Sequence, residues 1–512
     1  MAAKGQPMAQ RTAPNIIIVT TDQQRTDSLG CYGSAFAHTP NLDKLAGQGT
    51  LFERAYCANS VCTPSRVSIF TGQKLARHGV WNVGLNTPTD TRMISHVLGE
   101  RGYRTHYVGK AHFQYFGQGG EPSVESVRGW EAIYPGFVGP YYGFQTVELA
   151  PGHGTYGLTG HYGAWVAQQA APERFAEYCR SQPRSPEFCG EARDWSIPTR
   201  LHNSTWTADR TIEFLRSREA RQPFLLGVGF QDPHHPHGVP VDFADRCDPA
   251  AVGPGDYVEG ELADKPPHFL EARHGRLEQS LIRGEYWVAG QGPGADFTRI
   301  APADAALGRA YYFTLVRLID QQMGRILHAL EAAGLAENTI VVFTTDHGEL
   351  LGDHGLWMKG PFHYEQLVRV PTLLRWPAGL PGGKRIPGIL SHIDLAPTLL
   401  SAAGAHADAD GLDLLPALRG ERPWPRRSAV VELVDDPDKL RLKTLVTAGR
   451  KLTWYAGQEY GELYDLENDP GERINHWSDP TYAADKARLL GELLSECEGP
   501  EALRRVSRQC YA

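Results

Sequence analysis

Residues 15–21 read NIIIVTT, and this stretch decides the fold. Its apolar run is unbroken rather than alternating, which is typical of a strand buried on both faces of a parallel sheet. Residues 105–108, 224–230 and 339–344 have the same character. Helical patterns lie between these stretches, and strands that alternate with helices form mainly parallel sheets. We therefore predict an α/β fold with a large, mostly parallel sheet sandwiched between layers of helices.

Polar residues that can take part in catalysis or bind a metal ion follow all four apolar stretches. They are Asp22 and Gln23 after the first stretch, Lys110 and His112 after 105–108, Asp232 and His234 after 224–230, and Asp346 and His347 after 339–344. In open parallel sheets, ligands bind beyond the carboxyl ends of the strands. The four stretches therefore predict one active site at that edge of the sheet.

Two segments between the strands differ in character. Over residues 311–333, apolar residues return every three or four positions, and Gly334 ends the run, which predicts a helix. Residues 113–205 are instead rich in glycine and aromatic residues. We expect this segment to be an irregular insertion near the mouth of the site, with some of its aromatic side chains lining the pocket.

The pattern along the chain predicts three parts. Residues 1–13 have the character of a disordered leader, and residues 14–425 are predicted to form the catalytic α/β domain. The pattern then shifts to short strands, such as 429–434, and a closing helix covers about 481–496. Residues 426–512 are therefore predicted to form a smaller C-terminal α+β domain.

Composition excludes several classes of protein. The net charge of −8 argues against general nucleic-acid binding, which needs a basic face. No apolar run approaches the roughly 18 residues that a membrane span requires, and the first residues lack the apolar core of a secretory signal. The eight cysteines form neither a disulfide framework nor a paired zinc motif. We expect a cytoplasmic protein with mostly reduced thiols that binds neither membranes nor nucleic acid.

Residues 62–66 read CTPSR and form the most specific motif of the chain. Pro64 suits the first turn of a helix, because its missing N–H costs no hydrogen bond there. Cys62 would then lie at the N-terminus of that helix, where the helix dipole stabilises a developing negative charge. On residue type alone, a buried structural thiol is an equal alternative.

The CTPSR motif resembles the maturation signature of type I sulfatases, a family of the alkaline-phosphatase-like superfamily. Other stretches resemble further blocks of that family. These are residues 109–112 (GKAH), 232–236 (DPHHP), 352–360 (GDHGLWMKG) and 461–466 (GELYDL) with Asp469 and Pro470. The matching motifs run from Asp22 to Asp469 and so cover most of the chain.

The resemblance implies a role for each matching residue. Cys62 would be oxidised to formylglycine, an aldehyde whose hydrate is the nucleophile that attacks sulfur, so that one hard substitution becomes two easier steps. The implied roles of the others are that Arg66 holds the hydrated aldehyde, Lys110 binds a sulfate oxygen, His112 is the base that collapses the covalent intermediate, and His234 and Lys359 assist departure of the alcohol. His235 and His237 would lie at the rim or behind the reacting groups.

The same resemblance implies a site for one divalent metal ion. Its ligands would be Asp22, Gln23, Asp346, His347 and the group formed from Cys62. Oxygen ligands suit calcium, magnesium or manganese, and a histidine ligand tilts the choice slightly toward manganese. Calcium is the expected ion. Each residue taken alone also has a structural alternative to a role as metal ligand. Asp22 could cap a turn at the end of its strand, and His347 could be a hydrogen-bonded residue in a turn.

The function implied is the hydrolysis of a sulfate monoester, carried by a small molecule or a glycan, as in arylsulfatases. A formylglycine-generating enzyme would be needed for maturation, and relatives are often homo-oligomers, which we expect here too. Many family members carry the pairs Asp-Asp and Asp-Asn at these two places, where this chain has Asp22-Gln23 and Asp346-His347. Similar substitutions occur in relatives that cleave phosphonate monoesters, so a phosphonate monoester or phosphodiester hydrolase is the main alternative. A catalytically silent, glycan-binding homologue is the second.

Overall fold

The computed structural model describes most of the chain. The described residues are 13–116, 123–126, 129–130, 136–152, 157–180, 192–217, 222–275, 296–436 and 439–497. All of the leader predicted over 1–13, except residue 13 itself, lies outside these ranges.

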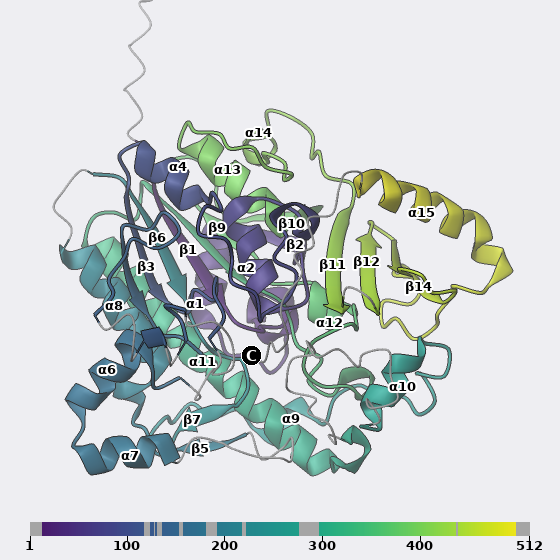
Figure 1. Cartoon of the computed structure of the whole chain (residues 1–512), viewed down its shortest axis with the longest axis horizontal. Coiled ribbons are helices and arrows are strands. Elements are labelled where there is room, and N and C mark those ends of the chain that lie inside the picture. Colours follow the sequence, from purple (N-terminus) through teal and green to yellow (C-terminus); the bar gives the residue numbers. More distant parts are fainter. Residues whose placement is uncertain are drawn as a thin grey trace, which may run out of the picture.

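An eight-stranded sheet forms the centre of the molecule (Figure 1). In spatial order its strands are β10 (Lys384–Ser391), β2 (Thr50–Tyr56), β9 (Leu373–Arg375), β8 (Thr339–Thr345), β1 (Asn15–Thr21), β6 (Phe224–Gly229), β3 (Arg104–Gly109) and β4 (Thr146–Leu149). The four apolar stretches of the sequence thus form neighbouring strands, β8, β1, β6 and β3, and all three of their pairings are parallel. This confirms the predicted sheet and places four strand ends side by side.

The sheet is mostly rather than wholly parallel. Strand β9 runs antiparallel to both of its neighbours, β2 and β8, whereas β2 and β10 are again parallel to each other. Every residue of β1 is buried, because strands flank it on both sides and helices cover both faces of the sheet. An unbroken apolar run is the composition that such a central position requires.

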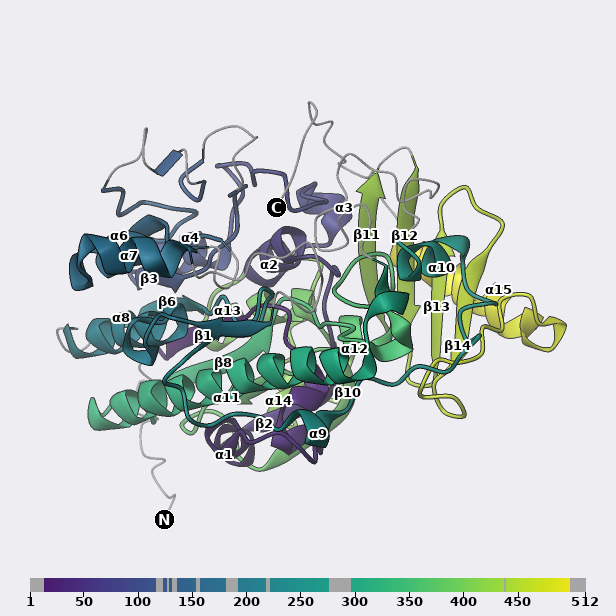
Figure 2. The same cartoon turned by 90° about the horizontal axis from the view of Figure 1, so that it is seen from below.

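Helices cover both faces of the sheet (Figure 2). The main ones are α1 (Pro40–Gln48), α2 (Cys62–Thr71), α4 (Ile94–Glu100), α8 (Asn203–Ser217), α11 (Pro302–Ala332) and α13 (Leu395–Ala402). Helices α1 and α11 lie on one side of the sheet, and α2 and α4 lie on the other. Helix α8 packs against α11, and α13 packs against α2. Shorter helices in the connections are α3 (Leu75–His78), α9 (Pro249–Val252), α10 (Pro267–Arg273), α12 (Glu365–Val368) and α14 (Leu415–Leu418).

Helix α11 is longer than the sequence pattern predicted. It begins at Pro302 instead of at residue 311, and it ends at Ala332, just before Gly334 adopts a positive φ of 66°. The sequence pattern missed this start because the first turns bury no large apolar side chain: the buried residues there are Ala305, Gly308, Arg309 and Ala310. Pro302 in the first turn is the local signal for this start.

The segment predicted to be irregular, 113–205, contains regular elements. Strand β4 belongs to it and forms the edge of the large sheet beside β3. Helices α6 (Gly160–Gln169) and α7 (Pro172–Arg180) follow, and β5 (Arg193–Trp195) pairs with β7 (Gly238–Pro240) in a small second sheet. A four-residue edge strand is too short to show a periodic pattern, which explains why the glycine-rich and aromatic composition concealed it. Tyr134 and Tyr156 of this segment lie outside the described residues.

The C-terminal part is a four-stranded antiparallel sheet covered by one helix. The strands are β11 (Ala429–Asp436), β12 (Leu440–Val446), β13 (Arg450–Tyr455) and β14 (Gly461–Asp465), in that spatial order. Helix α15 (Ala483–Glu496) packs on β12 and β13. Leu445, Leu452 and Leu463 from the sheet meet Leu489 and Leu493 of the helix in a separate hydrophobic cluster. The smaller α+β unit that the sequence predicted is therefore present.

The length and hydropathy of a helix decide whether it could cross a membrane. Among the described residues, no helix combines the length and the apolar character needed to cross a bilayer.

The packing of α15 generates a matched prediction. Leu493 is 2% exposed in the cluster and its neighbour Leu494 is 64% exposed. Replacing Leu493 by alanine should lower the free energy of unfolding by about 2–5 kcal/mol, because the truncation leaves a cavity. Leu494→Ala should change it by less than about 0.5 kcal/mol. Denaturant unfolding followed by circular dichroism measures both, and equal effects would contradict the packing of α15.

Candidate active site

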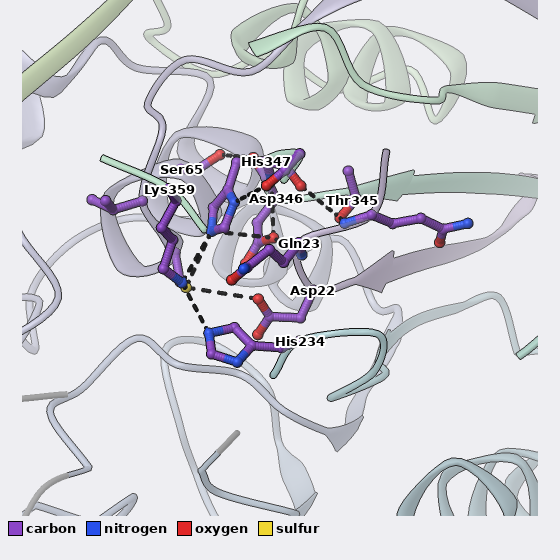
Figure 3. A network of polar contacts seen from close by, with 12 residues as sticks. Asp22, Gln23, Ser65, His234, Thr345, Asp346, His347 and Lys359 are labelled. Carbon is purple, nitrogen blue, oxygen red and sulfur yellow. Dashed lines mark hydrogen bonds and ion pairs between the residues drawn. The ribbon is translucent and has the colours of Figure 1, made fainter. Parts of the chain in front are cut away.

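The N-terminus of helix α2 faces the carboxyl ends of the central strands (Figure 3). Cys62 is the first residue of α2 and is fully buried, and Pro64 lies in the first turn as predicted. Burial raises the pKa of the Cys62 thiol to about 12, and the nearby Asp22 carboxylate adds to this rise. An encoded thiol in this place is therefore neutral at physiological pH and is a weak nucleophile.

Two carboxylates flank one arginine below Cys62. Asp22 follows β1 and Asp346 follows β8, and these strands are parallel neighbours, so both carboxylates emerge at the same edge. Arg66 Nε donates to Asp346 Oδ2 at 2.9 Å, and Arg66 Nη2 lies 3.5 Å from Asp22 Oδ2. All three side chains are fully buried. Burial opposes ionisation of Asp22, but Lys110 and Arg66 hold the pKa of its carboxyl far below the usual range.

The remaining N–H groups of Arg66 are also occupied. Its Nη1 donates to the Thr20 hydroxyl at 3.3 Å and to the Lys110 carbonyl at 3.0 Å, and its Nη2 donates to the Thr21 carbonyl at 3.2 Å. A guanidinium has five N–H donors in a fixed plane. Hydrogen bonds occupy four of these five donors, and the fifth belongs to Nη2, which lies 3.5 Å from Asp22 Oδ2 as an ion pair. Arg66 therefore ties α2 to the ends of β1 and β8.

The ring of His347 has a defined proton position. Its Nδ1 lies 2.9 Å from the Gly348 carbonyl, which can only accept, so Nδ1 carries the proton. Nε2 consequently presents a lone pair, 3.3 Å from Cys62 Sγ. Burial lowers the pKa of His347 to about 4, so the ring is neutral. A neutral imidazole held by its other nitrogen is the form that binds metal ions.

Lys359 contacts Cys62, and His234 contacts Lys359. Lys359 Nζ lies 2.8 Å from Cys62 Sγ and 3.0 Å from His234 Nε2. His234 Nδ1 faces the carbonyl of His235, so Nε2 is the acceptor for the lysine. Burial alone would lower the pKa of Lys359, whereas the Asp22 and Asp346 carboxylates raise it. Lys359 is therefore a charged proton donor.

Lys110 and His112 come from the turn that follows β3. Gly109 has a φ of +92°, and a Cβ there would lie 2.0 Å from the Gly229 carbonyl, so the close approach of β3 and β6 requires glycine. Lys110 Nζ contacts Asp22 Oδ2. Burial first, and then the charges of Lys110 and Arg66, lower the pKa of His112 well below its ordinary value. Its ring is therefore neutral and lies within the same charged cluster.

The residues present fit a divalent cation. One donor atom from each of Asp22, Cys62, Asp346 and His347 lies within 4.8 Å of the others, and all four residues are buried. The amide oxygen of Gln23, Oε1, is buried and has no hydrogen-bond partner among the described residues. An orphaned oxygen beside two carboxylates is what an oxygen-binding cation would satisfy. All residues predicted for catalysis and for the metal thus come together in one cluster.

Two buried glutamates near this cluster were not predicted from the sequence. Glu349 accepts a hydrogen bond from the amide of Gln23. Glu125 accepts the backbone N–H groups of His112 and Phe113, at 2.6 and 2.8 Å. The signal for Glu349 was its place two residues after His347. Glu125 lies in the segment 113–205, where no pattern marked it.

Comparisons with known proteins agree with this geometry. The profile of the family described as Sulfatase matches residues 14–405, and the profile described as N-sulphoglucosamine sulphohydrolase, C-terminal, matches residues 352–498. The uncharacterized sulfatase YidJ of Escherichia coli K12 is 28% identical and is matched over 94% of this chain and 86% of its own length. An arylsulfatase of Clostridium perfringens is 27% identical, with 95% of each chain covered. Among solved structures, the phosphonate monoester hydrolase of Agrobacterium radiobacter superposes with a TM-score of 0.75 at 25% identity, covering 94% of this chain and 95% of that one.

The arginine between the carboxylates generates a stability prediction. Arg66→Met should lower the free energy of unfolding of the metal-free protein by about 3–5 kcal/mol, because it leaves the buried Asp346 carboxylate without its partner. Arg77 is the matched control, since it also pairs with two aspartates, Asp408 and Asp410, but at the surface. Arg77→Met should cost at most about 1 kcal/mol. Denaturant titration compares the two, and a small loss for Arg66→Met would contradict its role.

Proposed function

Because this chain belongs to the sulfatase family, we propose that it hydrolyses an organic sulfate monoester with a nucleophile made from Cys62. The observation that carries the proposal is the setting of Cys62. It is buried at the N-terminus of a ten-residue helix, with Lys359 Nζ 2.8 Å and His347 Nε2 3.3 Å from its sulfur. A thiol with a raised pKa is a poor nucleophile here, which supports its conversion to another group.

The family generally uses a formylglycine and a metal ion, and we extend both to this chain. Formylglycine at position 62 supplies, as its hydrate, a hydroxyl nucleophile. A divalent cation, for which calcium is our choice, supplies positive charge that favours ionisation of that hydroxyl and balances charge on the transferring group. Asp22, Gln23, Asp346 and His347 would hold the cation.

The positively charged side chains divide into two roles. Four of the five donors of Arg66 bond to Asp346 and to groups of β1 and the β3 turn, so the main role of Arg66 is to set the geometry of the site. Lys110 and Lys359 are the cations that bind the sulfate oxygens. The role that the sequence resemblance implied for Arg66, which was to hold the hydrated aldehyde, stays a prediction. Fixed charges in a buried site stabilise a transition state strongly, because they need no reorganisation.

Proton transfer is divided between two sets of residues. Lys359 is charged and is hydrogen-bonded to His234, so it donates a proton to the departing alcohol oxygen while His234 holds it in place. His112 is neutral, so it can accept the proton of the second hydroxyl and release sulfate from the covalent intermediate. Opposite protonation states in one site suit an acid step followed by a base step.

Phosphonate monoester hydrolysis is the second candidate. The similarity to the Agrobacterium enzyme favours it, and a phosphonate monoester carries a single negative charge, as a sulfate monoester does. The two substrates differ in shape, because the sulfate group presents three non-bridging oxygens and the phosphonate group presents two. Lys359 faces the departing oxygen, so Lys110 and a cation remain for the non-bridging oxygens, and this number does not separate the two substrates. The match of residues 14–405 to the sulfatase profile favours sulfate.

The first test concerns the nucleophile. Cys62→Ala should lower kcat by at least about a thousandfold, because the nucleophile is lost and binding alone leaves little catalysis. Cys57→Ala is the matched control, since Cys57 is also a fully buried cysteine but has no role in the mechanism. It should retain activity. Full activity of Cys62→Ala would overturn the mechanism, and an unmodified thiol in active enzyme from the native host would overturn the modification.

The second test concerns the substrate class. We expect a higher kcat/KM for an aryl sulfate than for an aryl phosphonate monoester with the same leaving group, by at least about tenfold, which corresponds to about 1.4 kcal/mol in the transition state. The shared leaving group removes differences in its departure. The opposite ratio would assign the chain to phosphonate monoesters.

A further inference from the structure

The amide of Gln23 is held in one orientation. Its Nε2 donates to Glu349 Oε2 and lies 3.3 Å from His235 Nδ1, whereas its Oε1 is buried without a hydrogen-bond partner among the described residues. In Figure 3 the side chain lies among Asp22, Asp346 and His347. The amide oxygen is therefore the atom left over for a cation.

The contact with Glu349 is what decides this orientation. An amide has an oxygen and a nitrogen of nearly equal size, so shape does not distinguish the two ways of placing it. Glu349 is an acceptor on both of its oxygens: one receives the N–H groups of Leu351 and Met358, and the other receives the amide nitrogen of Gln23. Oε1 must then face the other way. An oxygen in that place binds a cation, whereas an NH₂ group repels it.

Glu349 is itself fixed by the backbone around Lys359. It is 2% exposed, and its Oε1 accepts the N–H groups of Leu351, at 2.9 Å, and of Met358. Gln23, Leu351 and Met358 are all non-glycine residues with positive φ, of 64°, 50° and 67°. Such conformations persist only where neighbouring contacts hold them, and one carboxylate contacts all three residues. Glu349 therefore connects the cation site with the segment that contains Lys359.

We propose that Glu349 is a positioning residue that orients the Gln23 amide and thereby sets the affinity of the cation site. The proposal rests on the metal dependence in the proposed function. It assigns to Glu349 no contact with the ion or with the substrate.

Isothermal titration of Ca²⁺ into the metal-stripped full chain tests the proposal. Every variant carries residue 62 in one chemical state, verified by mass spectrometry. Glu349→Gln should weaken Ca²⁺ binding about 10–100-fold, the usual effect of losing a partner of a metal ligand. The new NH₂ group opposes that of Gln23 and favours the flipped amide. Glu462→Gln is the matched control: Glu462 is a buried glutamate that accepts two tyrosine hydroxyls in the C-terminal sheet, and its loss should leave Ca²⁺ affinity within about twofold.

An exchange of the two side chains separates orientation from a general structural effect. In Gln23→Glu/Glu349→Gln, the new amide donates to the new carboxylate, which again offers one oxygen to the cation. The double variant should recover Ca²⁺ affinity to within about threefold of the parent. An unchanged affinity in Glu349→Gln, or a folded double variant no better than Glu349→Gln, would overturn the proposal.

Two further outcomes are distinguishable: a Glu349→Gln variant that does not fold, and a parent protein that binds no metal ion. If Glu349→Gln does not fold, the double variant is compared with Gln23→Glu, in which two carboxylates face each other. The proposal then requires at least tenfold tighter Ca²⁺ binding by the double variant, and equal affinities would overturn it. A parent protein that binds none of Ca²⁺, Mg²⁺ and Mn²⁺ would overturn the metal dependence and this inference together, whereas loss confined to the Glu349 comparison would leave the proposed function intact.

Discussion

The buried Asp22–Arg66–Asp346 arrangement is the constraint on which the site depends. Strands β1 and β8 are parallel neighbours, so the carboxylates that follow them emerge side by side in a region without solvent. Two such charges need a cation at once, because desolvated and unpaired they would cost several kcal/mol. Arg66, from the second turn of α2, pairs with both carboxylates, and Lys110 adds a second cation beside Asp22. The position of α2, and hence of Cys62 at its start, follows from charge compensation as much as from hydrophobic packing.

The remaining groups take their protonation states from this frame. Burial keeps His347 and His112 neutral, while neighbouring carboxylates keep Lys359 charged. Basic residues of one buried cluster thus differ in protonation state: the two histidines are neutral and the lysine is charged. Acidic, basic and ligating groups can therefore lie within a few ångströms of one another without exchanging roles.

Much of this arrangement could be predicted from the sequence, for a physical reason. A central strand buried on both faces must be continuously apolar, so β1, β6 and β8 were recognisable, and so were the polar residues at their ends. The early turns of α11 and the short edge strand β4 bury little, and they left no comparable pattern. Glu349 lies two residues after His347, but its role could not be predicted from that place, for a different reason. Its importance lies in which atom of Gln23 it contacts, and spacing along a chain does not encode the orientation of an amide.

The sheet order also has a consequence in time. Asn15 in β1 contacts Thr339 in β8, 324 residues later in the chain. At roughly 5–20 residues per second, a ribosome needs about 15–65 seconds to make the chain between them. Throughout that interval the first strand lacks one neighbour, and Cys62 cannot yet be enclosed by His347 and Lys359. Cys62 is made 285 residues before His347. Any enzyme that modifies this sulfur, which is fully buried in the finished protein, therefore has roughly 14–57 seconds of synthesis in which to reach it.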